Sequence, residues 1–285
     1  MQQRLTRLSE SGEIIGSMKN LAFMETRKLA RLIEHQRGVI GQIEAVAADF
    51  LAFFPETLPA MPSAHHIYLV VGSRRGFCGD FNERLVEELQ RKTAAAGTAR
   101  LTVIGVGQKL CRRLGAKYEL DSAIEGADVA EEIPSVLGTI VDRLESQRQR
   151  RGALQLSVVY QDAEEGIPCV VRMLPPFEDQ RGAPRQHENA PLLNLPARTF
   201  LLALGEQYLF AALHGVLFES LLAENDRRLR HLDGALRHLE QRVAGIRRHV
   251  QALRQEEIIE EIEVILLNAA DLDASVGSPL SPDAD

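Results

Sequence analysis

The sequence has few aromatic residues and few cysteines. Its 285 residues include 10 Phe, 4 Tyr and no Trp. This argues against a β-sandwich and against an RNA-binding protein that stacks bases, because both depend on aromatic surface. The three cysteines, Cys78, Cys111 and Cys169, are widely spaced and form no Cys-x-x-Cys pair. We therefore expect no disulfide framework, no metal site and a reducing compartment.

Long apolar runs and an excess of positive charge are also missing. The first residues, MQQRLTRLSESGE, lack the apolar core of a signal peptide, and no stretch approaches the ~18 uninterrupted apolar residues of a membrane span. Lys and Arg number 33 against 40 Asp and Glu, a net charge of −7, which argues against a nucleic-acid partner. The 45% of apolar residues is enough for a soluble, folded chain of one or two domains.

A heptad pattern runs through the first 53 residues. Positions 8, 15, 22, 29, 36, 43 and 50, with the companion positions 11, 18, 25, 32, 39, 46 and 53, are apolar at 11 of 14 sites. A period of 3.5 kept up this long predicts a helix with a narrow apolar seam. Pro55, Pro59 and Pro62 end this helix and begin a linker.

The middle of the chain alternates between two periods. Apolar runs rich in β-branched residues predict strands at 66–72, 100–107, 154–160 and 168–175. Amphipathic segments predict helices at 81–97, 108–115 and 129–149. Strands that alternate with helices indicate an α/β domain of Rossmann-like type with a largely parallel sheet.

The heptad pattern returns at residue 201 and continues to Leu253 with 14 of 16 seam positions apolar. The apolar face then restarts at Ile258, Ile262 and Ile265. The simplest partner for each terminal seam is the other seam. The sequence thus predicts a long antiparallel coiled coil of N- and C-terminal helices with an inserted α/β domain. The expected segments are a helix at 1–54, the α/β domain at 64–200, a helix at 201–272 and a frayed tail at 273–285. A compact bundle or a parallel homodimer is the alternative.

No motif in the sequence supports catalysis. The loop VGSRRGFCGDFN at 71–82 follows a strand and precedes a helix, but it matches neither of the common glycine-rich phosphate-binding patterns. Cys78 beside Arg75 could be an activated thiol, although an inert structural cysteine is the better interpretation. We expect no catalytic residue, no cofactor-binding residue and no metal ligand.

The second terminal helix is divided by charge. Residues 226–254 hold eight arginines against three acidic residues, whereas residues 255–273 hold seven acidic residues and no basic one. The basic part suits contact with acidic protein surfaces, and the following apolar face is wide enough that even a two-helix tip would leave part of it in water. A solvated coiled-coil flank is the alternative for the arginines.

Five segments, in order along the chain, resemble the γ subunit of F-type ATP synthases. RQEEIIEEIEVILLNAA (254–270) resembles that family's closing segment, and GSRRGFCGDFN (72–82) resembles its S-D-[RK]-G-L-C-G loop. SMKNLAFMETRKLAR, VVYQDAEEGIPCVVRMLP and LLAENDRRLRHLDGAL, at 17–31, 158–175 and 221–236, also have counterparts there. These matches span the chain from near residue 5 to 270.

The resemblance implies a non-catalytic central stalk, or rotor shaft, that couples ion flow to ATP synthesis or hydrolysis. Its implied partners are the α and β subunits of the hexamer, the membrane c-ring and an ε-type subunit, and its implied location is the cytoplasmic face of the bacterial inner membrane, where it is only peripheral. The motif matches assign contacts with β or the hexamer to Met18, Lys19, Arg27, Lys28, Arg75, Gly76, Cys78, Arg247, Arg248, Arg254, Gln255, Glu256, Ile258, Ile262 and Ile265.

Three positions depart from the family pattern. Arg74 stands where the family usually has Asp, Asp80 replaces a small residue, and Gly16 replaces a frequent Lys. These departures indicate a divergent γ of an alternative ATP synthase. Two other classes stay open at this point: a coiled-coil scaffold that homodimerises, and an α/β nucleotide-binding enzyme with helical arms.

Overall fold

The computed structural model describes residues 2–58, 65–96, 101–180 and 189–276. Two long helices, α1 (Gln2–Phe53) and α5 (Ala197–Val276), flank the central elements. These are the strands β1 (His65–Val71), β2 (Leu101–Val106), β3 (Leu120–Ile124), β4 (Leu154–Gln161) and β5 (Pro168–Leu174), the helices α2 (Phe81–Ala96), α3 (Gln108–Leu114) and α4 (Ile133–Arg151), and the short 3-10 turns η1 (Pro55–Thr57), η2 (Ala130–Glu132) and η3 (Glu178–Gln180).

The chain forms two compact units, and one of them combines two segments that are far apart in the sequence. One unit, the central unit, is Met18–Leu232 and contains the sheet; the other, the distal unit, is Met1–Ser17 with Asp233–Asp285. Each unit therefore contains a part of α1 and a part of α5. The segment boundaries predicted from the sequence stay predictions.

The five strands form one sheet in the order β3-β2-β1-β4-β5. β1 pairs in parallel with β2 and β4, and β2 pairs in parallel with β3, whereas β5 is antiparallel to β4. The prediction of a largely parallel sheet is confirmed. The β4–β5 connection is too short for a crossover: Asp162 Oδ1 accepts hydrogen bonds from the amides of Glu164 and Glu165, and Gly166 has a positive φ of 65°.

Sequence reasoning missed β3. Its residues read LDSAI, and among them only Ile124 is buried. An edge strand with so few apolar residues gives no buried-strand pattern. The amide of Gly107 donates a hydrogen bond to the Ile124 carbonyl oxygen at 2.9 Å. Gly107 has a φ of 108°, and a Cβ at this position would lie 2.4 Å from the Gly72 carbonyl oxygen, so only glycine fits there.

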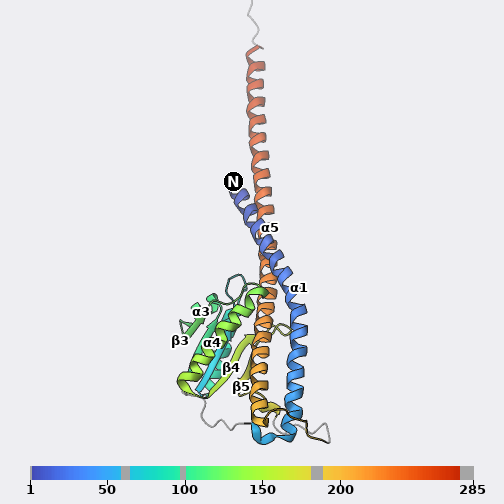
Figure 1. Cartoon of the computed structure of the whole chain (residues 1–285). Helices are drawn as coiled ribbons and strands as arrows, with labels where there is room; N and C mark the ends of the chain where they lie inside the picture. The colour runs from blue at the N-terminus through green and yellow to red at the C-terminus, as the bar shows by residue number, and fades with distance from the viewer. Residues whose placement is uncertain (1, 59–64, 97–100, 181–188, 277–285) are drawn as a thin grey trace, which may run out of the picture. The chain divides into compact units, whose positions relative to one another are not determined.

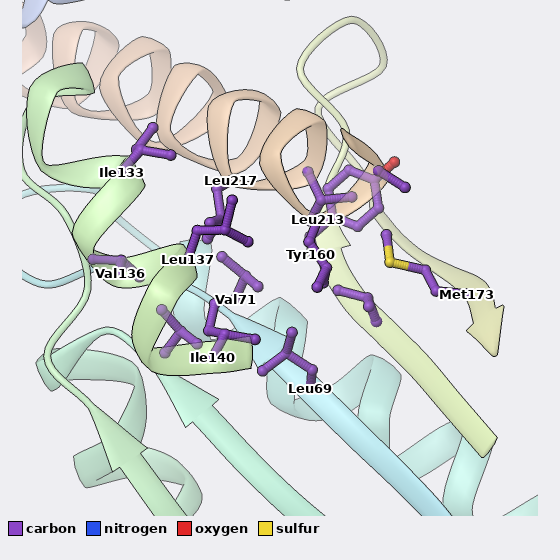
Figure 2. Close-up of a cluster of buried hydrophobic side chains, with 14 of the residues drawn as sticks. Leu69, Val71, Ile133, Val136, Leu137, Ile140, Tyr160, Met173, Leu213 and Leu217 are labelled. Atoms are coloured by element: carbon purple, nitrogen blue, oxygen red, sulfur yellow. The ribbon is translucent and has the colours of Figure 1, made fainter. Parts of the chain in front are cut away.

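Helices cover both faces of the sheet. On one face, α4 and α5 converge on β1, β4 and β5, as Figure 2 shows for Ile133, Leu137, Leu213 and Leu217 above Leu69. On the other face, α2 and α3 place Phe81, Leu85, Leu89, Leu110 and Leu114 over Tyr68, Val70, Val103 and Val159. This two-sided burial explains the nearly continuous apolar runs of β1 and β4.

Within the central unit, α1 and α5 run side by side in opposite directions (Figure 1). The ring centroids of Phe50 and Phe200 are 4.9 Å apart, and Gln36 Nε2 donates a hydrogen bond to the Ala211 carbonyl at 2.9 Å. Residue numbers that rise along α1 thus meet numbers that fall along α5. Phe50 also belongs to a third apolar cluster, at the end of the helix pair, with Leu51 and Leu201. The predicted antiparallel pairing is confirmed.

The predicted seam of α5 is confirmed as far as Val250 but not at Leu253, which is 44% exposed, and part of the seam of α1 is corrected. Every predicted seam position of α5 from 201 to 250 is at least partly buried. On α1, the companion positions Leu32, Val39 and Val46 are exposed, and the next residues, Ile33, Ile40 and Ala47, take their place. The face rotates because Leu29 and Ile33 pack into the core above the sheet as well as toward α5.

α5 is the one helix among the described residues that is long and apolar enough to cross a membrane by length and composition. Its most apolar 18-residue window has a mean hydropathy of 1.4, and 44% of that window is buried inside the protein. Packing against α1 and the sheet accounts for this apolar composition, because the core helix of a soluble protein has the same character.

Candidate partner-binding surfaces

The residues predicted to contact partners fall into two groups. Met18, Lys19, Arg27, Lys28, Arg75, Gly76 and Cys78 lie in the central unit, and the remainder, from Arg247 to Ile265, lie in the distal unit. We describe them as three surfaces: the loop surface (residues 18–28 of α1 and residues 72–80), the arginine collar (Arg247, Arg248 and Arg254) and the tip (residues 251–265 of α5).

The α1 part of the loop surface combines paired cations with exposed apolar side chains. The Lys28 ammonium lies 2.8 Å from Glu25 and 2.8 Å from Glu131, and these hydrogen-bonded carboxylates raise the pKa of Lys28 against the effect of its burial. The Arg27 guanidinium lies 5.3 Å from the Phe23 ring centroid, within cation–π range. Met18 and Lys19 are half-buried. Sequence reasoning missed the exposed neighbours Leu21, Phe23 and Met24.

Residues 72–80 connect β1 to α2 and are held from within. The Ser73 amide donates to Asn82 Oδ1 at 3.0 Å, and Asn82 Nδ2 donates to Ser73 Oγ at 2.7 Å. Cys78 is buried, and this burial raises the pKa of its thiol, so the side chain has the character of a structural cysteine. The exposed side chains here are those of Arg75, Phe77 and Asp80.

Phe77 is a feature of the loop surface that sequence reasoning missed. Its φ is 64°, and its side chain is 55% exposed. A bulky residue in this region of φ is strained and persists only where the surroundings fix it. Its position in the S-D-[RK]-G-L-C-G-like segment, where that pattern has leucine, was the available signal.

Carboxylates neutralise the arginines of the loop. Arg74 lies 2.7 Å from Glu125, 3.2 Å from Asp128 and 3.0 Å from Glu132, and Arg75 Nε lies 2.9 Å from Asp128. The carboxylates raise the pKa of the Arg74 guanidinium. The other charged departure is also paired: Asp80 Oδ1 accepts a hydrogen bond from Arg227 at 3.0 Å. Both unusual residues therefore have partners within the chain, whereas a Cβ at Gly16 would meet nothing within 4 Å.

The tip is a single helix without a partner in the described chain. A Cβ at Gly12 would lie 3.4 Å from Leu239 Cδ2, which sets the pairing of the two helices in the distal unit. Both helices rise by the same distance per residue, so Gln2, ten residues before Gly12, lies opposite about residue 249 of α5. Described residues of α1 therefore face α5 only as far as that point. All side chains from 251 to 265 are exposed. The tip is thus formed by one helix (Figure 1).

The tip is amphipathic although nothing in the described chain covers it. Ile258, Ile262 and Ile265 are 54%, 50% and 65% exposed, and at helical spacing they share one face. The opposite face carries the exposed Glu256, Glu260 and Glu263, and the exposed Glu257 and Glu261 flank the isoleucines. Arg254 and Gln255 precede this face and are exposed as well. A row of large apolar side chains in water marks a binding surface.

The collar differs from the loop surface in its electrostatics. Arg247, Arg248 and Arg254 are exposed, and within the described part of the chain none of them forms an ion pair. In the same ranges, no group of three or more His, Cys, Asp or Glu side chains is placed to hold a metal ion.

Comparisons with known proteins agree on one family. A family model described as ATP synthase matches residues 1–272. The ATP synthase gamma chain of Pelotomaculum thermopropionicum is 24% identical, with 96% of this chain and 98% of the relative covered. The ATP synthase gamma chain of Clostridium botulinum (strain Langeland) is 20% identical over 93% of this chain and 95% of the relative.

Solved structures share the fold. A chain of the Euglena gracilis mitochondrial ATP synthase in rotational state 3 aligns with a TM-score of 0.61 at 17% identity, covering 100% of this chain and 97% of that one. A chain of the Tetrahymena thermophila mitochondrial ATP synthase central stalk and c-ring aligns with a TM-score of 0.58 at 18% identity, covering 78% and 99%.

Two terminal helices paired around an inserted α/β domain thus define a central-stalk class of protein. The chain belongs to the ATP synthase gamma family. Its function is that of the central stalk of the F-type ATP synthase, a membrane-associated complex. The homodimerising scaffold is not favoured by these matches.

Proposed function

We propose that this chain is the rotor shaft of a bacterial F-type ATP synthase and has no catalytic site of its own. The paired helices enter the hexamer of α and β subunits, the α/β domain faces the membrane c-ring, and an ε-type subunit binds beside it. Rotation driven by ion flow then changes nucleotide binding on the β subunits. The complex lies on the cytoplasmic face of the inner membrane, and this chain touches the membrane only through it.

The observation that carries the proposal is the tip. The three large isoleucines on one face of this lone helix are exposed to water, which is unfavourable unless another protein buries them. Full burial of one such side chain contributes roughly 1.5–3 kcal/mol. A surrounding ring of subunits supplies that burial, and a small-molecule ligand does not. This favours Ile258, Ile262 and Ile265 as the residues that turn within an apolar sleeve.

The other residues follow from their positions and charges. Arg254, Gln255 and Glu256 stand at the base of the tip, where a loop of the β subunit would meet them. Arg247 and Arg248 have no ion pair within the described chain. They would bind an acidic lever of β. We also propose that this lever contacts the loop surface, which contains Met18, Lys19, Arg27, Lys28, Arg75, Gly76 and Cys78. For Cys78 the contact would go through its neighbours, because its own side chain is buried.

Co-expression with the cognate α and β subunits tests the assembly. We expect a purified complex with one copy of this chain per hexamer. Replacing Ile258, Ile262 and Ile265 together by Ser should lower the yield of that complex, whereas replacing Glu260 and Glu263 by Gln on the opposite face should preserve it. A wild-type chain that stays free in the presence of α and β would contradict the proposal.

A second variant tests the collar. Replacing Arg247, Arg248 and Arg254 by Gln should weaken ATP-driven ion pumping more than assembly, because the collar would act on a moving acidic surface. The matched control replaces Arg148 and Arg150, two exposed arginines of α4, by Gln. Unchanged pumping per ATP hydrolysed in the collar variant would remove the arginines from the mechanism.

A further inference from the structure

Glu224 and Arg228 form a buried ion pair on consecutive turns of α5. Among the described residues, they are the only acidic and the only basic residue that are buried, at 2% and 8% exposure. The guanidinium donates a hydrogen bond to the Glu224 carboxylate. Buried ion pairs rarely stabilise a fold more than apolar residues of the same volume would, because both charges lose their hydration. The pair therefore calls for a reason beyond packing.

The partners of Arg228 indicate that reason. Its Nη1 donates to Asn225 Oδ1 at 2.9 Å, so that two groups of its own helix fix the guanidinium plane. Its Nε then donates to the carbonyl oxygen of Gly76 at 3.4 Å. Gly76 lies in the middle of residues 72–80, between exposed Arg75 and strained Phe77. The ion pair on α5 thus orients one donor toward the backbone of the loop.

Neighbouring side chains of α5 also form hydrogen bonds at the carboxyl ends of β1 and β4. Ser220 Oγ donates to the carbonyl oxygen of Val71, the last residue of β1, at 3.3 Å. Arg227 donates to Asp80 Oδ1 at 3.0 Å and to the Gly166 carbonyl oxygen, in the β4–β5 turn, at 3.1 Å. α5 therefore crosses the carboxyl ends of β1 and β4.

Open parallel sheets bind ligands at the carboxyl ends of their strands. β2 and β3 lie on one side of β1 and β4 on the other, so the order of strands reverses there and leaves a crevice in other proteins of this fold class. In this chain, side chains of α5 occupy that position. This arrangement disfavours a nucleotide-binding enzyme. Where a ligand would bind, the α/β domain instead contacts the shaft helix α5.

We propose that Arg228, oriented by Glu224 and Asn225, is a positioning residue that fixes residues 72–80 to α5, so that the α/β domain and the shaft turn together. The inference rests on the proposed rotor function. It gives the buried pair a mechanical role: torque received by the α/β domain passes into α5 through hydrogen bonds at residues 220–228, and the loop keeps one orientation relative to the helix.

The test uses Arg228→Met, which keeps most of the side-chain volume and removes every hydrogen-bond donor. Burial raises the pKa of Glu224 to about 7, so the carboxyl left behind can remain protonated and need not become an unpaired buried charge. Arg228→Lys retains a cation beside Glu224 but loses the planar set of donors. Arg230→Met is the matched control, since Arg230 is exposed and pairs only with Asp226 on its own helix.

Two measurements separate this inference from the proposed function. Amide hydrogen exchange of the free full-length chain should rise about tenfold at residues 74–79 in Arg228→Met, rise less in Arg228→Lys and stay unchanged in Arg230→Met. In the assembled complex, Arg228→Met should pump fewer ions per ATP hydrolysed, with one copy of the chain still present per hexamer.

Unchanged loop exchange in Arg228→Met would overturn the inference, and so would full coupling despite a loosened loop. Either result leaves the rotor proposal intact, because that proposal depends on assembly of the wild-type chain. Failure of the wild-type chain to assemble would instead contradict the rotor function, while the exchange experiment would still report on the attachment of the loop. If Arg228→Met does not fold, the same comparison is made between Arg228→Lys and Arg230→Met.

Discussion

Replacing Arg74 by Asp, the residue usual in the family, should destabilise this chain. Three carboxylates surround the guanidinium, at 2.7 Å from Glu125, 3.2 Å from Asp128 and 3.0 Å from Glu132. The Arg74 side chain is only 24% exposed and that of Asp128 only 14%, so solvent screens these pairs less than it screens fully exposed ones. A carboxylate at position 74 would become the fourth in this cluster.

The expected size follows from the number of contacts. Partly exposed ion pairs contribute about 0.2–1 kcal/mol each, so the loss of three pairs costs about 1.5 kcal/mol. Repulsion between the new carboxylate and its neighbours adds a similar amount at an effective dielectric constant near that of a protein surface. We expect Arg74→Asp to lower the free energy of unfolding by about 3 kcal/mol and Arg74→Met by about half of that.

Urea unfolding of the full-length chain, followed by circular dichroism, measures both variants. About half of the effect of Arg74→Asp should disappear in 1 M salt, where the Debye length is about 3 Å. Arg148→Asp is the control: Arg148 is exposed and pairs with Glu145 alone, so the loss of stability should be much smaller than that of Arg74→Asp. If Arg74→Asp and Arg74→Met were equally stable, or if salt had no effect, the carboxylates would not be what holds the loop.

Three further predictions concern packing, backbone and pH. Phe50→Ala should cost about 3–5 kcal/mol in the same urea assay, because the side chain is 2% exposed and packs between the rings of Phe54 and Phe200; a loss below about 1 kcal/mol would refute this. Gly107→Ala should prevent soluble expression, since its Cβ would lie 2.4 Å from the Gly72 carbonyl oxygen; a soluble variant with an unchanged urea midpoint would contradict this. Burial raises the pKa of Glu224 to about 7 even though Arg228 and Arg75 lower it, while Asp128 raises it further, and the buried thiol of Cys78 is a neighbour as well. The folded chain therefore holds a proton that the unfolded chain gives up, so stability should fall as pH rises from about 4.5 through 7. Glu224→Gln should remove this part of the pH dependence, and an identical pH profile in both proteins would exclude Glu224 as its source.

Sequence reasoning succeeded where one physical pattern repeated over many residues. The α5 seam from Leu201 to Val250 is such a pattern, and its burial follows from heptad spacing alone. It failed by one residue on α1, where Ile33 and Ala47 are buried instead of Leu32 and Val46. The apolar residues at both sets of positions look alike in the sequence. Only the contact of Leu29 and Ile33 with the core above the sheet decides which face turns inward.

The candidate surfaces were predictable as segments but not as electrostatic environments. Family motifs located Lys28 and Arg75, yet their ion-pair partners Glu131 and Asp128 lie far from Lys28 and Arg75 in the sequence. No spacing rule connects these residues, because the fold of the α/β domain brings them together. The position of Arg228 beneath Gly76 was hidden for the same reason.

The charge pairing also decides where an acidic partner can bind most favourably. On the loop surface, Lys28, Arg74 and Arg75 already contact five carboxylates of this chain, those of Glu25, Glu125, Asp128, Glu131 and Glu132. An acidic segment that approaches there must displace or repel these groups, so charge attraction is weak and the exposed Phe77 and Met24 offer apolar contact instead. At the collar, Arg247, Arg248 and Arg254 have no ion pair within the described residues, so an approaching carboxylate displaces only water and counterions. Electrostatic coupling to an acidic lever is therefore expected to depend more on the collar than on the loop surface. Neutralising the collar should reduce the salt sensitivity of ion pumping more than neutralising Arg75 does.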